Sequence, residues 1–174
     1  MKKNYKKIGI LGGTFDPPHI GHLHISKIAI KKLKLNNLIW IIAKNNPFKK
    51  KPELSTQTRI KLSKKITKNY KKISIKYFDK KKKYENTYDL LKFIKKKNKK
   101  NQILFLIGAD NLIKFHKWKK WKKIPELAKI VVFARENYLK KAVNSIAAKN
   151  LEKKDWFYIN NKKMNISSSL IRKF

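Results

Sequence analysis

Short apolar runs alternate along this chain with segments in which apolar residues recur at helical spacing. Three runs are apolar throughout, which is typical of strands covered on both faces: LIWII (38–42), ILFLI (103–107) and IVVFA (130–134). Three further runs have the length and composition of strands: KIGIL (7–11), ISIKY (73–77) and WFYIN (156–160). The segments between the runs predict four helices: 20–33, 56–69, 87–98 and 137–149.

The alternation of strand and helix predicts an α/β fold with a single doubly wound, mostly parallel sheet. A length of 174 residues suits one domain over 1–174, and no internal repeat or linker divides the chain. In open parallel sheets, ligands bind beyond the carboxyl ends of the strands. Five of the six predicted strands are followed by polar, glycine-bearing or basic segments, so we expect a ligand site at that rim.

The high positive charge of the chain does not change the prediction of an α/β fold with a ligand site. The formal net charge is +37, but only three of the 47 basic residues are arginines. The lysines are spread over the whole chain, which indicates a solvated coat rather than a stripe that binds nucleic acid. Such a coat attracts anionic substrates such as nucleotides, and its self-repulsion predicts a salt-dependent fold. A basic nucleic-acid-binding protein remains the remote alternative.

The scarcity of arginine makes each one informative. Lysine supplies charge throughout this chain, whereas arginine is required where a planar fork must grip a phosphate or a carboxylate from two sides. Arg59, Arg135 and Arg172 are therefore candidates for contacts that depend on geometry.

Other absences narrow the class of protein. The chain has no cysteine, which excludes disulfides, thiol nucleophiles and thiolate metal sites. No apolar run approaches the eighteen residues of a membrane span, and the start of the chain lacks a secretory signal. We therefore expect a cytoplasmic protein without membrane contact.

The stretch IGILGGTFDPPHIGHLHI (8–25) carries the candidate chemistry. Gly12 and Gly13 lack side chains, so backbone amides there can approach a ligand closely. A helix that begins near Pro18 would offer its N-terminus to an anion, and His19 and His22, three apart, would share one face of it. The third glycine of G-x-G-x-x-G and the G-K-[ST] of a P-loop are missing. We expect phosphate contact, with a structural role or a metal site as open alternatives.

Two motifs resemble one enzyme family. GGTFDPPHIGH (12–22) resembles the signature of nucleotidyltransferases with a His-x-Gly-His motif, and GGTFDPPH is the form typical of nicotinate-nucleotide adenylyltransferases. ISSSLIR (166–172) resembles the family's Ile-Ser-Ser/Thr-x-x-Ile-Arg element. Weaker matches fill most of the chain between them: STQTR (55–59), NTYDLL (86–91), IGADNLIKFHKW (107–118) and FAREN (133–137).

The resemblance implies a Rossmann-like nucleotidyltransferase fold and adenylyl transfer in NAD biosynthesis. The 5′-phosphate of nicotinate mononucleotide would attack the α-phosphate of ATP, with Mg²⁺ on the triphosphate, to give nicotinate adenine dinucleotide and pyrophosphate. An enzyme for nicotinamide mononucleotide, or another adenylyl- or cytidylyltransferase of the superfamily, is the alternative. A relative without activity is disfavoured by the intact His-x-Gly-His and arginine set.

The resemblance also implies residue roles, with no metal ligand among the side chains. The catalytic candidates are His19, His22 and Arg172. The ATP-binding candidates are Gly12, Gly13, Thr14, Phe15, Asp110, Ser167 and Ser168. The candidates for binding nicotinate mononucleotide are Asn45, Lys50, Thr87, Trp118 and Arg135.

The chain departs from the family pattern at three places. The segment AKNNPFKKK (43–51) lacks several of the family's usual residues, and FAREN lacks its Pro-Gly turn. The chain ends two residues after Arg172, so we expect a shortened C-terminal helical segment. The sequence leaves the oligomeric state open.

Overall fold

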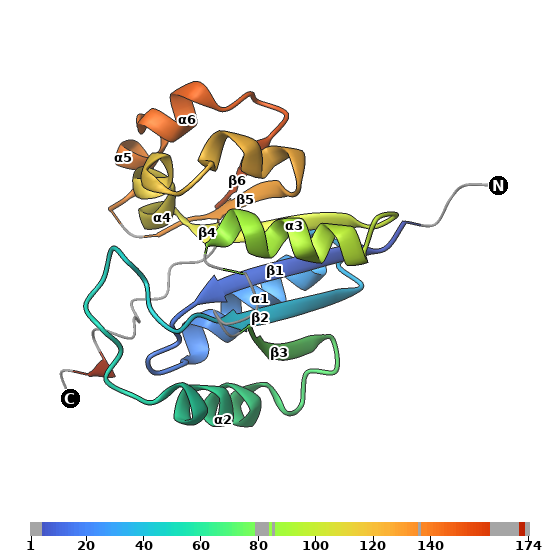
Figure 1. Ribbon diagram of the computed structural model, residues 1–174, viewed down its shortest axis with the longest axis vertical. Coiled ribbons are helices and arrows are strands. Elements are labelled where there is room, and N and C mark those ends of the chain that lie inside the picture. The colour runs from blue at the N-terminus through green and yellow to red at the C-terminus, as the bar shows by residue number, and fades with distance from the viewer. Residues whose placement is uncertain (1–4, 79–83, 85, 136, 161–170, 173–174) are drawn as a thin grey trace. The chain divides into compact units, whose positions relative to one another are not determined.

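The computed structural model describes residues 5–78, 84, 86–135, 137–160 and 171–172. In this part of the chain, six strands form a sheet with the order β3-β2-β1-β4-β5-β6 (Figure 1). The α/β class and the parallel sheet predicted from the alternating pattern are thereby confirmed.

The chain divides into two compact units. We call residues Gly9–Asp79 with Met164–Phe174 the N-terminal unit, and residues Met1–Ile8 with Lys80–Lys163 the central unit. The single domain expected over 1–174 stays a prediction.

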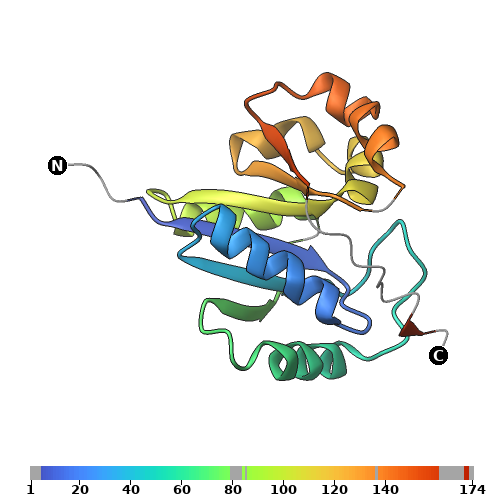
Figure 2. The ribbon, with the colours of Figure 1, turned by 180° about the vertical axis from the view of Figure 1, so that it is seen from behind.

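The N-terminal unit contains two strand–helix–strand steps. Its elements are β1 (Lys7–Gly13, which starts in the central unit), α1 (Ile20–Lys32), β2 (Asn37–Ile42), α2 (Thr56–Thr67) and β3 (Ile73–Tyr77). β2 and β3 pair in parallel, with Leu38 opposite Ile73 and Ile42 opposite Tyr77. α1 and α2 contact each other and both pack on β2; Figure 2 shows α1 across the sheet from behind.

Small and polar residues form the buried faces of these two helices. α1 buries Gly21, Ser26 and Ala29, which allow its backbone to approach the sheet closely. α2 buries three polar residues at intervals of four, Arg59, Ser63 and Thr67, and this spacing places them on one face. The apolar core comes from the strands, whose Ile10, Leu38, Trp40 and Ile42 are at most 1% exposed.

The central unit is built around β5. Its elements are α3 (Thr87–Lys97), β4 (Gln102–Gly108), α4 (Ala109–Lys114), the 3₁₀ helices η2 (Phe115–Lys117) and η3 (Trp121–Glu126), β5 (Lys129–Phe133), α5 (Leu139–Val143), α6 (Ile146–Asn150) and β6 (Trp156–Ile159). β5 pairs in parallel with β4 on one side and with β6 on the other. Residues 103–107 and 130–133 are all buried, as their uninterrupted apolar runs predicted.

The predicted helix over 137–149 is wrong. Two short helices replace it, because the Ser145 hydroxyl accepts a hydrogen bond from the Ala148 amide (3.2 Å) and begins α6 anew. Helix α4 and the two 3₁₀ helices lie between β4 and β5, where the sequence pattern predicts no helix. The described helices include none with the length and apolar character that crossing a membrane requires.

Candidate nucleotide-binding site

The carboxyl ends of β1 and β2 lie side by side in the N-terminal unit. The Ala43 amide donates to the Gly13 carbonyl (2.7 Å), which extends the pairing past both strands. The glycine-rich turn that follows β1 and the segment 43–51 that follows β2 therefore start from neighbouring points. In open α/β sheets ligands bind beyond the carboxyl ends of the strands, and the two segments start at this position.

The turn after β1 is held by a buried aromatic stack. Phe15 is 1% exposed and has a φ of 50°, a left-handed conformation that costs a non-glycine residue about 1–2 kcal/mol. Its ring stacks on the fully buried ring of Trp40, with centroids 4.8 Å apart and planes at 14°. A Cβ on Gly13 would lie 3.3 Å from the Phe15 ring, so a glycine is suited to this position even before any ligand binds.

His19 and His22 form a reciprocal cap at the start of α1. His19 is the N-cap, and its Nδ1 accepts a hydrogen bond from the Gly21 amide (3.1 Å). The Nδ1 of His22 accepts one from the His19 amide (3.2 Å). The two ring centroids are 3.8 Å apart, so the predicted shared face is confirmed. This pairing is a capping box in which imidazoles replace the usual hydroxyl and carboxylate.

Ser26 and Trp40 support the same turn from below. The Trp40 indole Nε1 donates to the Ser26 hydroxyl (2.8 Å), which donates to the His22 carbonyl (2.8 Å). The His22 ring also contacts the stack, with its centroid 4.7 Å from that of Phe15 and 5.9 Å from that of Trp40. His22 is therefore held through its backbone, its Nδ1 and its ring.

Asp16 connects this turn to two segments that are distant in sequence, the residues before α2 and the C-terminal Arg172. Its buried carboxylate accepts hydrogen bonds from the Glu53 and Leu54 amides, both at 2.9 Å. Arg172 donates from Nη1 to the carboxylate (3.2 Å) and to the Asp16 carbonyl, and its Nε lies 3.1 Å from a Glu53 carboxylate oxygen. The structure thus places the predicted Arg172, 27% exposed, beside the turn that leads to His19.

Arg59 holds the loop starts together from inside. It is 1% exposed, and all five of its donors reach uncharged oxygens. These acceptors are the carbonyls of Leu54 (3.1 Å), Thr14 (2.6 Å), Ala43 (2.7 Å) and Lys44 (3.2 Å) and the Thr56 hydroxyl (3.0 Å). Burial lowers the pKa of the Arg59 guanidinium, and the nearby Asp16 raises it. The prediction that Arg59 makes contacts that depend on geometry is confirmed, although its fork binds four backbone carbonyls and a hydroxyl rather than a phosphate or a carboxylate.

The remaining predicted residues of the N-terminal unit are open to solvent or line the turn. Asn45 and Lys50 are exposed in the segment after β2, where the Asn46 side chain accepts from the Phe48 amide (2.9 Å). Gly12 is exposed and Thr14 is half-buried, next to the capped histidines in sequence. Ser167 and Ser168 lie outside the described residues.

In the central unit, Asp110 and Arg135 pair with each other. Arg135 Nη1 lies 2.6 Å from Asp110 Oδ2, while Asp110 Oδ1 is buried and has no hydrogen-bond partner among the described residues. A Cβ on Gly108 would lie 2.5 Å from that Oδ1, so glycine leaves room for the carboxylate at the start of α4. The family resemblance implies contacts with different substrates for the two residues, and it does not predict their ion pair.

Trp118 lies in an aromatic cluster of the central unit. Its ring centroid is 5.0 Å from that of Phe115 and 6.1 Å from that of Phe105. Its indole Nε1 is buried and unpartnered within the described part of the chain. Thr87, the other residue predicted near the pyridine ring, begins α3 directly after its N-cap Asn86.

Sequence reasoning missed the residues that support the histidines. Asp16, Ser26 and Trp40 were not among the candidates, although Asp16 stands inside the quoted motif. The N–H of a buried tryptophan usually finds a hydrogen-bond partner, and this tendency is the available signal for Trp40. Among the described residues, no cluster of three or more His, Cys, Asp or Glu side chains is suited to hold a metal ion.

A parallel α/β sheet with a glycine-rich turn and paired imidazoles after its first strand defines a nucleotidyltransferase of the Rossmann-like type. The sequence agrees, since residues 10–174 match the family model described as Cytidylyltransferase-like, and the chain belongs to that family.

Several relatives carry one activity in their names. The chain is 48% identical over 173 residues to the probable nicotinate-nucleotide adenylyltransferase of Pelagibacter ubique (strain HTCC1062), covering 99% of this chain and 96% of that protein. It is 34% identical over 178 residues to the protein of that name from Clostridium perfringens (strain ATCC 13124), covering 96% and 85%. The solved structure of Plasmodium falciparum nicotinic acid mononucleotide adenylyltransferase complexed with NaAD matches with a TM-score of 0.77 at 22% identity, covering 98% and 84%.

Proposed function

We propose that this chain transfers the adenylyl group of ATP to nicotinate mononucleotide, giving nicotinate adenine dinucleotide and pyrophosphate in NAD biosynthesis. The observation that carries the proposal is the pair of imidazoles of His19 and His22, whose ring centroids lie 3.8 Å apart at the capped start of α1. The name shared by the relatives supports the acceptor, and the family match supports the class of transfer.

In the proposed reaction, a phosphate oxygen of the mononucleotide forms a bond to the α-phosphorus as the bond to the β-phosphate oxygen breaks. Such a transfer needs positioning and charge stabilisation rather than a covalent enzyme intermediate. His19 and His22 would donate hydrogen bonds to phosphate oxygens, with His22 nearest the α-phosphate. Amides of the Gly12–Phe15 turn would line the phosphate path, and Arg172 would add positive charge.

Mg²⁺ enters this proposal as part of the ATP substrate. The ion usually keeps several waters and binds substrate phosphates with only one or two protein carboxylates. The buried Asp16 carboxylate is engaged by two amides and Arg172, which leaves it poorly suited to a resident ion. We therefore assign the ion to the triphosphate. We also propose that the protein is located in the cytoplasm, where ATP is available.

The mononucleotide end of the site rests on the family resemblance. Trp118 would stack on the pyridine ring, with Thr87 near its carboxylate. Arg135 would contact the mononucleotide, and Asp110 would contact the ribose of ATP. The ion pair between the two residues would then link the two substrate positions. Asn45 and Lys50 would meet the 5′-phosphate, and Ser167 and Ser168 the triphosphate.

The test compares three acceptors in one assay. Pyrophosphate release is measured with ATP, Mg²⁺ and either nicotinate mononucleotide, nicotinamide mononucleotide or phosphopantetheine. We expect the highest kcat/KM with nicotinate mononucleotide and almost none with phosphopantetheine. A preference for either other acceptor, or for CTP over ATP, would contradict the proposal.

A further inference from the structure

The two histidines of the cap each use the same ring nitrogen for the backbone. The Nδ1 of His19 accepts from the Gly21 amide, and the Nδ1 of His22 accepts from the His19 amide. Both donors are main-chain N–H groups, which cannot reverse the direction of these hydrogen bonds. Each Nδ1 must therefore present a lone pair.

A neutral imidazole carries one N–H, and its position is set by the hydrogen bond that the other nitrogen makes. We infer that the first turn of α1 fixes both His19 and His22 as the tautomer protonated at Nε2. The capping box is then a positioning device for chemistry as well as a helix cap. The amides of residues 19 and 21 are its positioning groups.

The ring surroundings hold these tautomers in place. The His22 ring lies against the rings of Phe15 and Trp40, and the backbone carbonyl of His22 accepts a hydrogen bond from the Ser26 hydroxyl. The His19 ring lies against that of His22, with centroids 3.8 Å apart. A ring flip would have to break the Nδ1 bond to the backbone and leave an amide at the helix N-terminus without its acceptor.

The consequence for function rests on the proposed adenylyl transfer. Both rings would meet phosphate oxygens as N–H donors without first gaining a proton. The tautomer also has no ring lone pair for a metal ion, because Nδ1 is engaged and Nε2 is protonated. It therefore favours the phosphate reading over the metal reading that the sequence left open.

The direct test is ¹⁵N NMR of the full chain labelled at histidine nitrogens, at a pH where the rings are neutral. Long-range proton–nitrogen spectra distinguish a protonated from an unprotonated ring nitrogen. The chain has four histidines, so His19→Asn and His22→Asn are used to assign signals, because each variant lacks the set that belongs to the replaced residue. We expect Nε2–H for both histidines, with His22 unchanged in His19→Asn because its donor is a backbone amide. A protonated Nδ1 at either residue would overturn the inference.

A second measurement, on two variants of His19, separates its role as a helix cap from its role as a hydrogen-bond donor to phosphate. Asn is a good N-cap but lacks a donor at the Nε2 position, whereas Gln caps poorly and places an amide N–H nearer that position. We expect His19→Asn to melt higher than His19→Gln, and His19→Gln to keep about tenfold more turnover, as a hydrogen bond to a charged group implies. If His19→Asn also had the higher turnover, the donor role would be overturned. Unchanged turnover in both variants would refute the donor role of His19. Nε2–H signals in a chain that releases no pyrophosphate from ATP and nicotinate mononucleotide would uphold the tautomers and refute the proposed function.

Discussion

At the scale of single residues, the account depends on side chains that serve the fold and the chemistry together. His19 and His22 cap a helix through Nδ1, while the aromatic stack below them fixes the ring of His22. Spacing in the sequence predicted that the two rings share a face. It did not predict that both Nδ1 atoms bind backbone amides, because that depends on the backbone conformation at the start of α1.

Trp118 carries the prediction for the mononucleotide end. Replacing it with alanine should raise the KM for nicotinate mononucleotide by about tenfold, since loss of one base-stacking ring costs about 1–3 kcal/mol. The KM for ATP should change little. Steady-state kinetics with each substrate varied in turn measure both values.

Trp156→Ala is the matched control, because Trp156 lies in β6 and is also half-buried. It should leave the KM for nicotinate mononucleotide near the wild-type value. An increase confined to ATP in Trp118→Ala would move Trp118 to the other substrate.

At the scale of elements, Arg59 connects α2 to the ends of β1 and β2. Its acceptors lie up to 45 positions away in sequence, so its partners could not be predicted from local pattern. The scarcity of arginine correctly marked the position as one where the planar fork matters. The acceptors differ from the anion that the fork argument suggests, because carbonyl and hydroxyl oxygens can also satisfy the five N–H groups of a guanidinium.

Arg59→Lys should therefore lower the free energy of unfolding by about 2–6 kcal/mol. Lysine has three donors in place of five, so at least two buried acceptors lose their partner, at about 1–3 kcal/mol each. Urea titration followed by circular dichroism measures this value.

Lys65→Ala on the exposed side of the same helix should change the free energy of unfolding by less than about 0.5 kcal/mol. Equal stability of Arg59→Lys and the wild type would show that the five hydrogen bonds do not hold the loop starts.

The strands were easier to predict than the helices that follow β4. Uninterrupted apolar runs identified β4 and β5, because buried parallel strands have no polar face. The segment from Ala109 to Glu126 forms one α-helix and two 3₁₀ helices, each too short for a helical period to stand out. Ser145 similarly divides a segment whose composition alone favours one helix.

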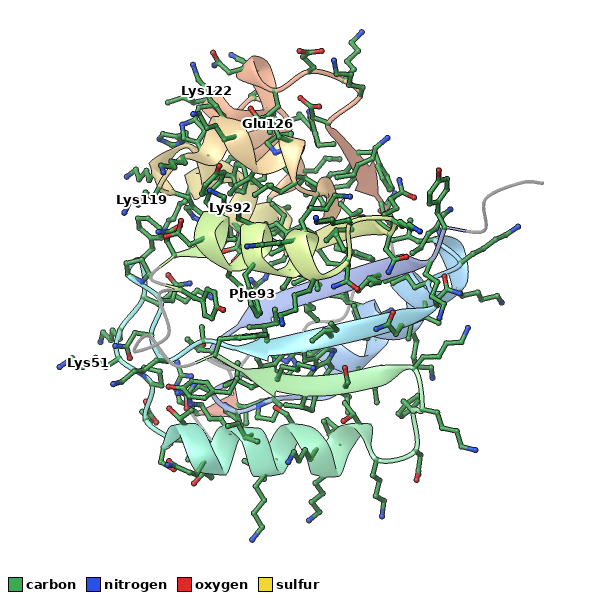
Figure 3. All side chains as sticks on the ribbon, turned by 45° about the vertical axis from the view of Figure 1, so that its right-hand side comes forward. Lys51, Lys92, Phe93, Lys119, Lys122 and Glu126 are labelled. Atoms are coloured by element: carbon green, nitrogen blue, oxygen red, sulfur yellow. The ribbon has the colours of Figure 1, made fainter. Side chains whose placement is uncertain are left out.

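At the scale of the whole molecule, the dominant fact is the net charge of +37. Figure 3 shows the labelled Lys92, Lys119 and Lys122 of the central unit, and Lys51 of the N-terminal unit, extending outward from their ribbons. Lysines on many elements support the interpretation as a solvated coat. A coat of one sign repels itself in the folded state.

We therefore expect the melting temperature to rise by several degrees when NaCl is increased from about 10 mM to about 100 mM. The Debye length falls from about 30 Å to about 10 Å over this range, so repulsion between distant lysines is screened. Differential scanning calorimetry measures the shift.

KCl at the same ionic strength is the control and should give the same shift, because screening depends on ionic strength rather than on the cation. A melting temperature that stayed constant or fell with salt would contradict net repulsion in the fold.

The central claim is that the His19–His22 turn stabilises charge on phosphates during adenylyl transfer. The most direct measurement is the rate of pyrophosphate release from ATP and nicotinate mononucleotide in His22→Ala, with His24→Ala on the same helix as control. The account predicts a fall in kcat of about 10²–10³-fold for His22→Ala, the cost of removing one donor to developing charge. It predicts near-wild-type turnover for His24→Ala. Near-wild-type turnover in a folded His22→Ala protein, or equal losses in the two variants, would contradict it.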